Sequence, residues 1–203
     1  MAAEARKEFD MSFRELVRAR RSIRKYSDRA VAREHLEMIV KAGQYAPSGG
    51  NNQSSHFLVF TGREKICELN SIIKAEFSKM KPYEGMYKSM VNTVNNSRRE
   101  DYDFSYGAPV LILVANKIGY SNAMADSVLC LENMLLQATD LGISSCYVNQ
   151  VNWLRNDPSV LEYLYSCGLK EDERVFCSAV FGHSEMTSLP QLPRHGNEAT
   201  FIE

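Results

Sequence analysis

The sequence has no long apolar run, no excess of either charge and no visible export signal. No segment approaches the roughly 18 apolar residues that a membrane-spanning helix requires. Residues 1–10, MAAEARKEFD, lack the apolar stretch of a secretory signal. The 24 Lys and Arg are offset by 25 Asp and Glu, which argues against a general nucleic-acid binder. We therefore expect a cytoplasmic protein with neither a membrane nor a nucleic-acid partner.

Common cofactor and metal motifs are also missing. The sequence contains no GxGxxG, GxxxxGKS/T, GxSxG or HExxH, so Rossmann dinucleotide folds, P-loop NTPases, α/β-hydrolases and common zinc hydrolases lose support. The 5 cysteines are widely spaced, with no CxxC and no zinc-site spacing to a histidine. We expect buried or incidental thiols, histidines with structural roles, and no metal site.

The residues that are present predict one domain. No repeat, low-complexity tract or Pro/Gly-rich linker divides the 203 residues, and a chain of this length can bury a full core. Helical apolar periods alternate with short apolar runs, which favours an α+β three-layer domain. We assign no structure to Lys81–Tyr106 and expect Gly182–Glu203 to run as an extended arm. The expected helices are one beginning after Ser12, Arg33–Tyr45, Lys65–Met80, Asn122–Leu141 and Pro158–Cys167, and the expected strands are His56–Thr61, Pro109–Ala115, Ile143–Val148 and Arg174–Phe181.

The first helix has a clear start and a cation at its end. Ser12 and Glu15 form a capping-box pattern. Phe13, Leu16 and Val17 lie at helical spacing and are expected to face inward. The next position on this stripe is a cation, Arg20, so positive charge is expected to continue the inward face.

A candidate anion site follows in the segment RRSIR. Alternate residues of an extended chain point the same way, so Arg20, Ser22 and Arg24 can converge on one anion. Two guanidinium groups and a hydroxyl suit a phosphate monoester. The alternative interpretation is a solvated basic turn.

A second candidate site is the loop Ala46–Gln53, APSGGNNQ. Its small residues let the backbone approach a ligand closely, and its amide side chains supply donors and acceptors. The alternative is a simple turn at which Pro47 ends the preceding helix.

The helix expected over Asn122–Leu141 is apolar on several faces, which is typical of a central, buried helix. Asp126, Asn133 and Gln137 share one polar stripe on it. Buried polar groups need partners. Hydrogen bonds across a subunit interface and capping of neighbouring loops in the same chain are the two alternatives.

The order of the motifs resembles the FMN-dependent nitroreductase family. RRSIRKY is followed by APSGGNNQSSHF, GAPVLILVA, ADSVLCLENMLLQATDLGISSCYV, NDPSVLEYL, VFCSAVFGHSE and finally LPR. The resemblance runs from about Phe13 to Arg194 and depends on order and spacing rather than on a single motif. It implies a homodimer with a central, mostly antiparallel sheet flanked by helices, in which the C-terminal arm of each subunit adds to the sheet of the other. Residues 1–203 are then one FMN-binding domain, with 1–11 as a flexible N-terminal extension.

The resemblance also assigns roles around FMN. The RRSIR segment and Arg194 match the phosphate and ribityl site, and two FMN molecules are expected at the dimer interface, each touched by both chains. The loop after Ala46 matches the wall supplied by the partner subunit, and the segment after Val148 matches the backbone amide that faces flavin N5. No catalytic side chain is required, since the chemistry belongs to the flavin. The expected cofactor-binding residues are Arg20, Arg21, Ser22, Arg24, Pro47, Ser48, Gly49, Asn51, Asn149, Gln150 and Arg194.

Two positions depart from the family pattern. Asn149 stands where many relatives have glycine, which is expected to alter the hydrogen bond to N5 and the flavin potential. Gln53-Ser54-Ser55 stands where relatives commonly show Gln-Pro-Trp, so a packing residue near the flavin loop is missing.

The function implied by the resemblance is hydride transfer from NAD(P)H through flavin N5 to a small, planar aromatic acceptor, a nitroaromatic or a quinone, by a ping-pong mechanism. A specialised flavin enzyme (reductive dehalogenation or flavin breakdown) and a non-catalytic FMN carrier or sensor are the alternatives. The segment Lys81–Tyr106 is expected to form a substrate-facing lid, or else a plain dimer-contact helix. The lid residues that suit planar acceptors are Tyr83, Met86, Tyr87, Met90, Tyr102, Phe104 and Tyr106.

Overall fold

The fold is built around one antiparallel sheet. The structure, a computed structural model, describes residues 11–186 and 193–203. Within them four strands pair in the order β1-β2-β4-β3, and all three pairings are antiparallel. The strands are β1 (His56–Phe60), β2 (Val110–Lys117), β3 (Ser144–Val148) and β4 (Glu173–Gly182).

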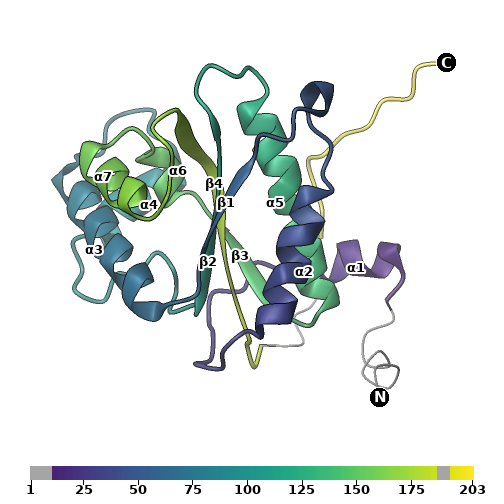
Figure 1. Ribbon diagram of the computed structural model, residues 1–203, viewed down its shortest axis with the longest axis horizontal. Coiled ribbons are helices and arrows are strands. Elements are labelled where there is room, and N and C mark those ends of the chain that lie inside the picture. The colour runs from purple at the N-terminus through teal and green to yellow at the C-terminus, as the bar shows by residue number, and fades with distance from the viewer. Residues whose placement is uncertain (1–10, 187–192) are drawn as a thin grey trace.

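Helices cover both faces of this sheet, giving three layers (Figure 1). The predicted α+β, three-layer architecture is therefore confirmed. One face carries α1 (Phe13–Ala19), α2 (Arg33–Gln44) and α5 (Ala123–Asp140), and the other carries α3 (Arg63–Lys79), α4 (Lys88–Asn96), α6 (Gln150–Trp153) and α7 (Pro158–Ser166).

The core divides into two halves, one on each side of the sheet. Alternate side chains of a strand point to opposite faces. Leu111 and Leu113 of β2 accordingly pack with α3, whereas Ile112 and Val114 pack with α2 and α5. All four side chains are fully buried. The expectation that the Pro109–Ala115 run is covered on both faces is confirmed for the strand that it forms.

Close packing of α2 on α5 depends on a glycine. A Cβ atom on Gly43 would clash with Met134 Cε and would lie 3.0 Å from Met134 Cγ.

The α5 helix ends at Asp140, and Gly142 follows with a left-handed backbone, φ 67°. The predicted end of this helix is therefore confirmed to within one residue.

The first helix begins as predicted but does not face the core. The side chain of Ser12 accepts from the Glu15 amide, and the Glu15 carboxylate accepts from the Ser12 amide at 2.8 Å, so the capping box is confirmed. The expected inward stripe is wrong for the single chain, because Phe13 is 72% exposed and Val17 is 47% exposed. The helix contacts α5 at the rim of the domain, where one chain offers no second layer to cover the stripe.

Element types agree with the sequence prediction, with three additions. The helices α4 and α6 and the short 3₁₀ helix η1 (Gly49–Asn51) were not assigned; α4 lies within the segment left without structure. Residues 193–203 have no helix or strand and project from the body as an extended trace (Figure 1). Residues 1–10, which make up most of the expected N-terminal extension, and Leu189–Leu192 of the tail lie outside the described residues. In the part of the chain that is described, no helix has the length and apolar character to cross a membrane.

Candidate functional site

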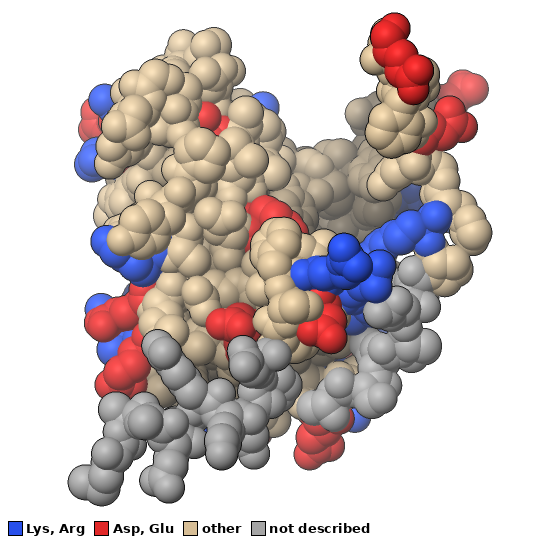
Figure 2. Space-filling view, turned by 90° about the vertical axis from the view of Figure 1, so that its right-hand side faces the viewer, with Lys and Arg blue, Asp and Glu red and all other residues tan. Residues whose placement is uncertain are grey.

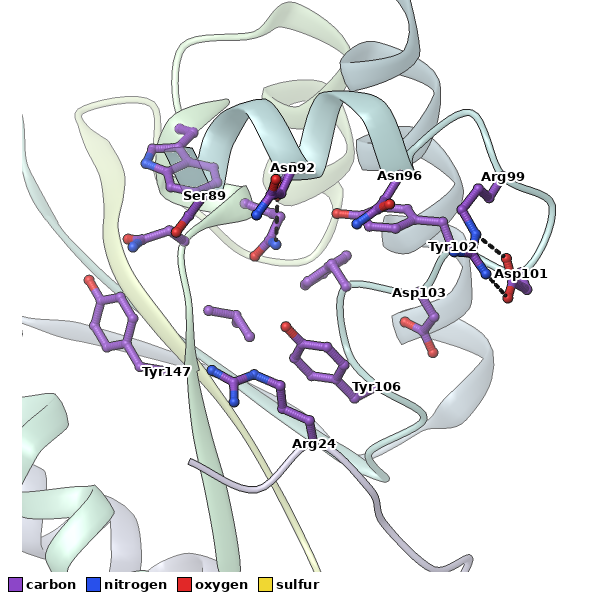
Figure 3. A pocket seen from close by; sticks show the side chains of 16 residues that line it. Arg24, Ser89, Asn92, Asn96, Arg99, Asp101, Tyr102, Asp103, Tyr106 and Tyr147 are labelled. Atoms are coloured by element: carbon purple, nitrogen blue, oxygen red, sulfur yellow. Dashed lines mark hydrogen bonds and ion pairs between the residues drawn. The ribbon is translucent and has the colours of Figure 1, made fainter. Parts of the chain in front are cut away.

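A cavity of about 480 Å³ opens on the face of the sheet that carries α4, a size typical of small-molecule sites. Arg24 and Tyr106 form one side of it, α4 forms the opposite wall, and Tyr147 lies at one end (Figure 3). Asn149 and Gln150, at the start of α6, also line the cavity. The further lining residues that matter below are Ser89, Asn92, Thr93, Asn96, Tyr102, Phe104 and Trp153.

The wall formed by α4 is polar. Ser89, Asn92 and Asn96 lie at helical spacings of three and four, so they share the face turned to the cavity (Figure 3). The methionines of the segment lie elsewhere: Met86 and Met90 pack against the core. The prediction that the methionines of the lid line the site is therefore wrong, because the apolar side of α4 is used to hold the helix on the domain.

Aromatic lining comes from other positions than expected. Tyr102, Phe104 and Tyr106 line the cavity as predicted. The exposed Tyr83 and Tyr87 are not among its lining residues. Tyr147 and Trp153 were missed, since one lies on a strand and the other in a one-turn helix with no distinctive motif.

Arg24 is held beside the cavity by a loop tied to the sheet. Ser22 forms a parallel bridge with Ser145 of β3, and the Ile23 amide donates to the Ser145 carbonyl at 2.9 Å. The guanidinium carbon of Arg24 lies 5.9 Å from the centre of the Tyr106 ring, a cation–π distance. The loop thus places a positive charge at the cavity wall.

Arg24 is the member of the predicted anion site that lines the cavity, whereas Arg20 and Ser22 are not among its lining residues. Burial raises the pKa of the Cys146 thiol on β3, while the charge of Arg24, a hydrogen bond with Ser22 and the charge of Arg20 act to lower it. Arg20 also forms an ion pair with Glu132, with Nε 3.6 Å from Oε1.

Arg21 is directed differently from its neighbours. Its Nη1 donates to the backbone carbonyls of Arg18 and Arg20, at 2.5 Å and 2.8 Å. These contacts hold its side chain against the end of α1, and it is not among the residues that line the cavity. Of the RRSIR residues the structure therefore brings Arg24 to the cavity, with Arg20 paired with Glu132 of α5 and Arg21 on the helix side of the loop.

Gln150 presents an unused acceptor in the same wall. The residue is 9% exposed, and its Nε2 donates to Thr93 Oγ1 at 3.4 Å. Its Oε1 is enclosed and has no hydrogen-bond partner among the described residues. Burial raises the pKa of the neighbouring Tyr102 to about 12, so its hydroxyl keeps its proton. A buried acceptor without a partner is costly, and either a ligand N–H or the Tyr102 hydroxyl, which is also enclosed without a partner in the described part of the chain, can satisfy it.

The second predicted loop lies apart from this cavity in the single chain. Gly49 N donates to both carboxylate oxygens of Asp126 on α5, at 3.2 Å and 3.3 Å. Pro47, Ser48 and Asn51 are likewise absent from the cavity lining. The structure thus brings Arg24, Asn149 and Gln150 to one cavity and leaves the Pro47–Asn51 loop on the α5 side of the sheet.

Arg194 is the remaining predicted site residue. It is exposed and lies in the projecting C-terminal segment. It is not among the residues that line the cavity within this chain. Its predicted role as a cation at the same phosphate requires the segment to reach a second chain.

The polar stripe of α5 has partners within the chain. Asp126 binds Gly49, Asn133 Nδ2 donates to the Ala42 carbonyl at 3.2 Å, and Gln137 Nε2 donates to Asp140 at 3.2 Å. All three side chains therefore have partners in the same chain, and hydrogen bonds across a subunit interface stay a prediction.

An antiparallel sheet between helical layers, with a cavity on one face that Arg24 lines, defines a class of ligand-binding α+β domains. The nitroreductase family model matches residues 17–183, and the chain belongs to the nitroreductase family. The Archaeoglobus fulgidus "Putative NADH dehydrogenase/NAD(P)H nitroreductase" is 30% identical over 66% of this chain, which spans only 64% of that relative. The "4-nitrobenzoate reductase" of Nocardioides sp. is 27% identical, with 86% of this chain and 81% of that protein covered.

Solved structures agree with this assignment. A nitroreductase from Bacteroides fragilis, crystallised with bound FMN, superposes with a TM-score of 0.83 and 33% identity. The match covers 93% of this chain and 97% of that one. Its coverage shows that the whole described sheet and both helical layers belong to the family fold.

Proposed function

We propose that this chain is an FMN-dependent oxidoreductase that transfers hydride from NAD(P)H to a small, planar aromatic acceptor such as a nitroaromatic or a quinone. The observation that carries the proposal is the cavity that joins the cation Arg24 to Asn149 and Gln150 in a nitroreductase fold. Because relatives named nitroreductase and "NADPH-flavin oxidoreductase" match the chain, the reaction class follows from both the site and the family.

The residues present fit FMN. Arg24 at the cavity wall, with Arg20 and Ser22 in the same loop, supplies the cationic and hydroxyl groups that a phosphate and a ribityl chain need. The partnerless Oε1 of Gln150 offers an acceptor to a ring N–H. When bound, FMN supplies the hydride chemistry at N5, and the chain binds, orients and tunes it. Arg24 stabilises negative charge at the cavity, and Asn149 begins the segment proposed to face N5.

We also propose that the working form is a homodimer. The face formed by α1, α2 and α5 keeps apolar side chains in solvent, and much of it carries neither cations nor anions (Figure 2). A patch of this kind marks an interaction surface. The Pro47–Asn51 loop borders this face, so it can complete the cavity of a second subunit. The exposed apolar residues are Phe13, Val17, Met38, Tyr45, Met124, Val128 and Leu129.

The acceptor is proposed from the cavity walls. Tyr106, Tyr147 and Trp153 offer aromatic surface to a planar ring. The polar side of α4 offers neutral hydrogen-bonding groups, Asn92 and Asn96 among them, to nitro or carbonyl oxygens.

Turnover by a ping-pong mechanism follows if donor and acceptor use this one space in succession. Initial rates at several acceptor concentrations should give parallel double-reciprocal lines, and intersecting lines would exclude the shared space.

The experiment that tests the function starts from purified protein. We expect a yellow protein whose acid-released cofactor co-migrates with FMN, and stoichiometric FAD would contradict the proposal. Under anaerobic conditions NADH or NADPH should bleach the flavin, and nitrobenzoate or a quinone should restore its absorbance. Bound FMN that neither nucleotide reduces would favour the carrier alternative, and turnover only with halogenated or flavin substrates would favour the specialised enzyme.

A further inference from the structure

The Pro47–Asn51 loop has an unusual backbone for an exposed segment. Gly50 has φ 60°, and the non-glycine residues Asn51 and Gln53 have φ 55° and 50°. Left-handed conformations of residues with a side chain cost free energy, and they persist only where their surroundings enforce them. Pro47, Gly50 and Asn51 are nevertheless exposed, so core packing does not enforce this shape.

A buried carboxylate enforces it instead. Asp126 is 4% exposed, and both of its oxygens accept from the Gly49 amide. The Tyr120 hydroxyl lies 2.7 Å from Asp126 Oδ2 and 3.1 Å from the Gly49 carbonyl oxygen. It has one proton, which the shorter contact to the carboxylate takes. Gly49 is thus held through its amide by a side chain 77 residues away.

The space around the Gly49 Cα atom is also filled by neighbouring side chains. A Cβ atom at this position would lie 2.8 Å from Tyr120 Oη and would clash with Asn122 Nδ2. Ser48 adds a second tie, because its Oγ accepts from the Gln53 amide at 3.0 Å. Burying a carboxylate to fix an exposed loop is costly, which indicates that the outward shape of the loop is what the arrangement preserves.

We infer that Asp126 and Tyr120 are positioning residues, which lock the Pro47–Asn51 loop in the shape that completes the flavin cavity of the partner subunit. The inference rests on the proposed function, since it requires FMN and a second subunit. The position of Asp126 in the fold agrees with this role. Asp126 lies in the first turn of α5, between Met124 and Val128, which are exposed on the proposed dimer face.

The test compares three variants with the full-length wild-type protein. Asp126→Ala removes both acceptors, and Tyr120→Phe removes one hydroxyl from a partly exposed ring. Glu173→Gln is the control, because Glu173 is a second buried carboxylate, 2% exposed, whose partners His56 and Lys170 are not part of the Pro47–Asn51 loop. The dissociation constant of FMN, the midpoint potential of the bound flavin and the thermal midpoint of each apoprotein are measured.

We expect Asp126→Ala to raise the FMN dissociation constant at least about tenfold, because a hydrogen bond to a charged group is worth roughly that factor or more. Tyr120→Phe should raise it less, and both should shift the flavin potential. Glu173→Gln should lower the thermal midpoint and leave FMN affinity unchanged within about twofold. Asp126→Asn, which keeps one acceptor for Gly49, should recover part of the affinity.

Three outcomes overturn the inference. If wild type binds no FMN, both the proposed function and the positioning role of Asp126 and Tyr120 are wrong. If wild type binds FMN, and Asp126→Ala and Tyr120→Phe both retain its affinity and potential, the positioning role is wrong while the proposed function stands. If Glu173→Gln loses affinity in proportion to its lost stability, as Asp126→Ala does, the effect is general destabilisation and not positioning.

Discussion

The contribution of Arg24 to cofactor binding can be worked out from its surroundings. The guanidinium group stands at the cavity wall beside the Tyr106 ring, and no carboxylate pairs with it among the described residues. Its charge is therefore available to an anionic ligand. A hydrogen bond to a charged group contributes about 1.5–3 kcal/mol. Arg24→Ala should thus weaken FMN binding by roughly tenfold to a hundredfold.

The assay is a titration of the apoprotein with FMN, followed by quenching of flavin fluorescence. Arg24→Lys keeps the charge but loses the forked donors, so its affinity should fall between those of wild type and Arg24→Ala. The difference between wild type and Arg24→Ala should narrow at high ionic strength, since salt screens exposed charges. Lys79→Ala is the control, because Lys79 pairs with Glu76 on α3, outside the proposed dimer face, and is not among the residues that line the cavity.

Arg20→Ala should shift the affinity in the same direction as Arg24→Ala. Part of the Arg20 charge is already engaged by Glu132, so the smaller loss is expected for Arg20. Affinity within about twofold of wild type in both variants would refute the phosphate-site assignment, because that factor is well below one charge-assisted hydrogen bond.

Three further predictions concern stability and assembly. Gly182→Ala should lower the free energy of unfolding by about 1–3 kcal/mol in denaturant titrations, because its Cβ would lie 2.7 Å from Pro109 Cδ and 2.9 Å from Tyr26 Cδ1, both on rigid rings; an unchanged midpoint would contradict that packing. Burial raises the pKa of Glu173, but hydrogen bonds from His56 and the Lys170 amide lower it by more, so the net pKa is below its usual range. The ionised Glu173 therefore contributes stability that is present above the usual glutamate pKa of about 4.3 and is lost as the pH falls through the depressed pKa. Glu173→Gln should make the free energy of unfolding depend less steeply on pH in this acid range. Sedimentation should give about twice 23.0 kDa, and deleting residues from Leu189 onward should release FMN and lower stability together, whereas a truncated monomer that keeps its flavin would exclude the exchanged arm.

Sequence patterns predicted the sheet well because each strand contains a short apolar run, which is continuous in β2. The β2 run is buried on both sides, and such runs are readable without knowledge of their partners. The helix α4 was not assigned because it is only 9 residues long and contains few apolar residues, Met90, Val91 and Val94, from which a helical period could be established. The polar face that this helix turns to the cavity explains why the lid lining was predicted only in part.

Contacts between distant segments were beyond the sequence pattern. The stripe containing Asp126 left two alternatives open, because its partner Gly49 is 77 residues away and no local motif links them. The inward stripe of α1 was misplaced for a related reason: periodicity shows that Phe13 and Val17 share a face, but not whether the same chain covers it. Alternation along the RRSIR segment likewise does not show that Arg20 pairs with Glu132 of α5 while Arg24 lines the cavity.

The RRSIR loop also closes a strand edge. The outermost strand β3 pairs with β4 on one side only, and its other side is met by the bridge between Ser22 and Ser145. An open strand edge is a template for unwanted pairing between molecules. The loop that presents Arg24 to the cavity therefore also protects the protein against aggregation. Its evolution is constrained twice, since a change of shape that suited another ligand would uncover the backbone of Ser145 and its neighbours.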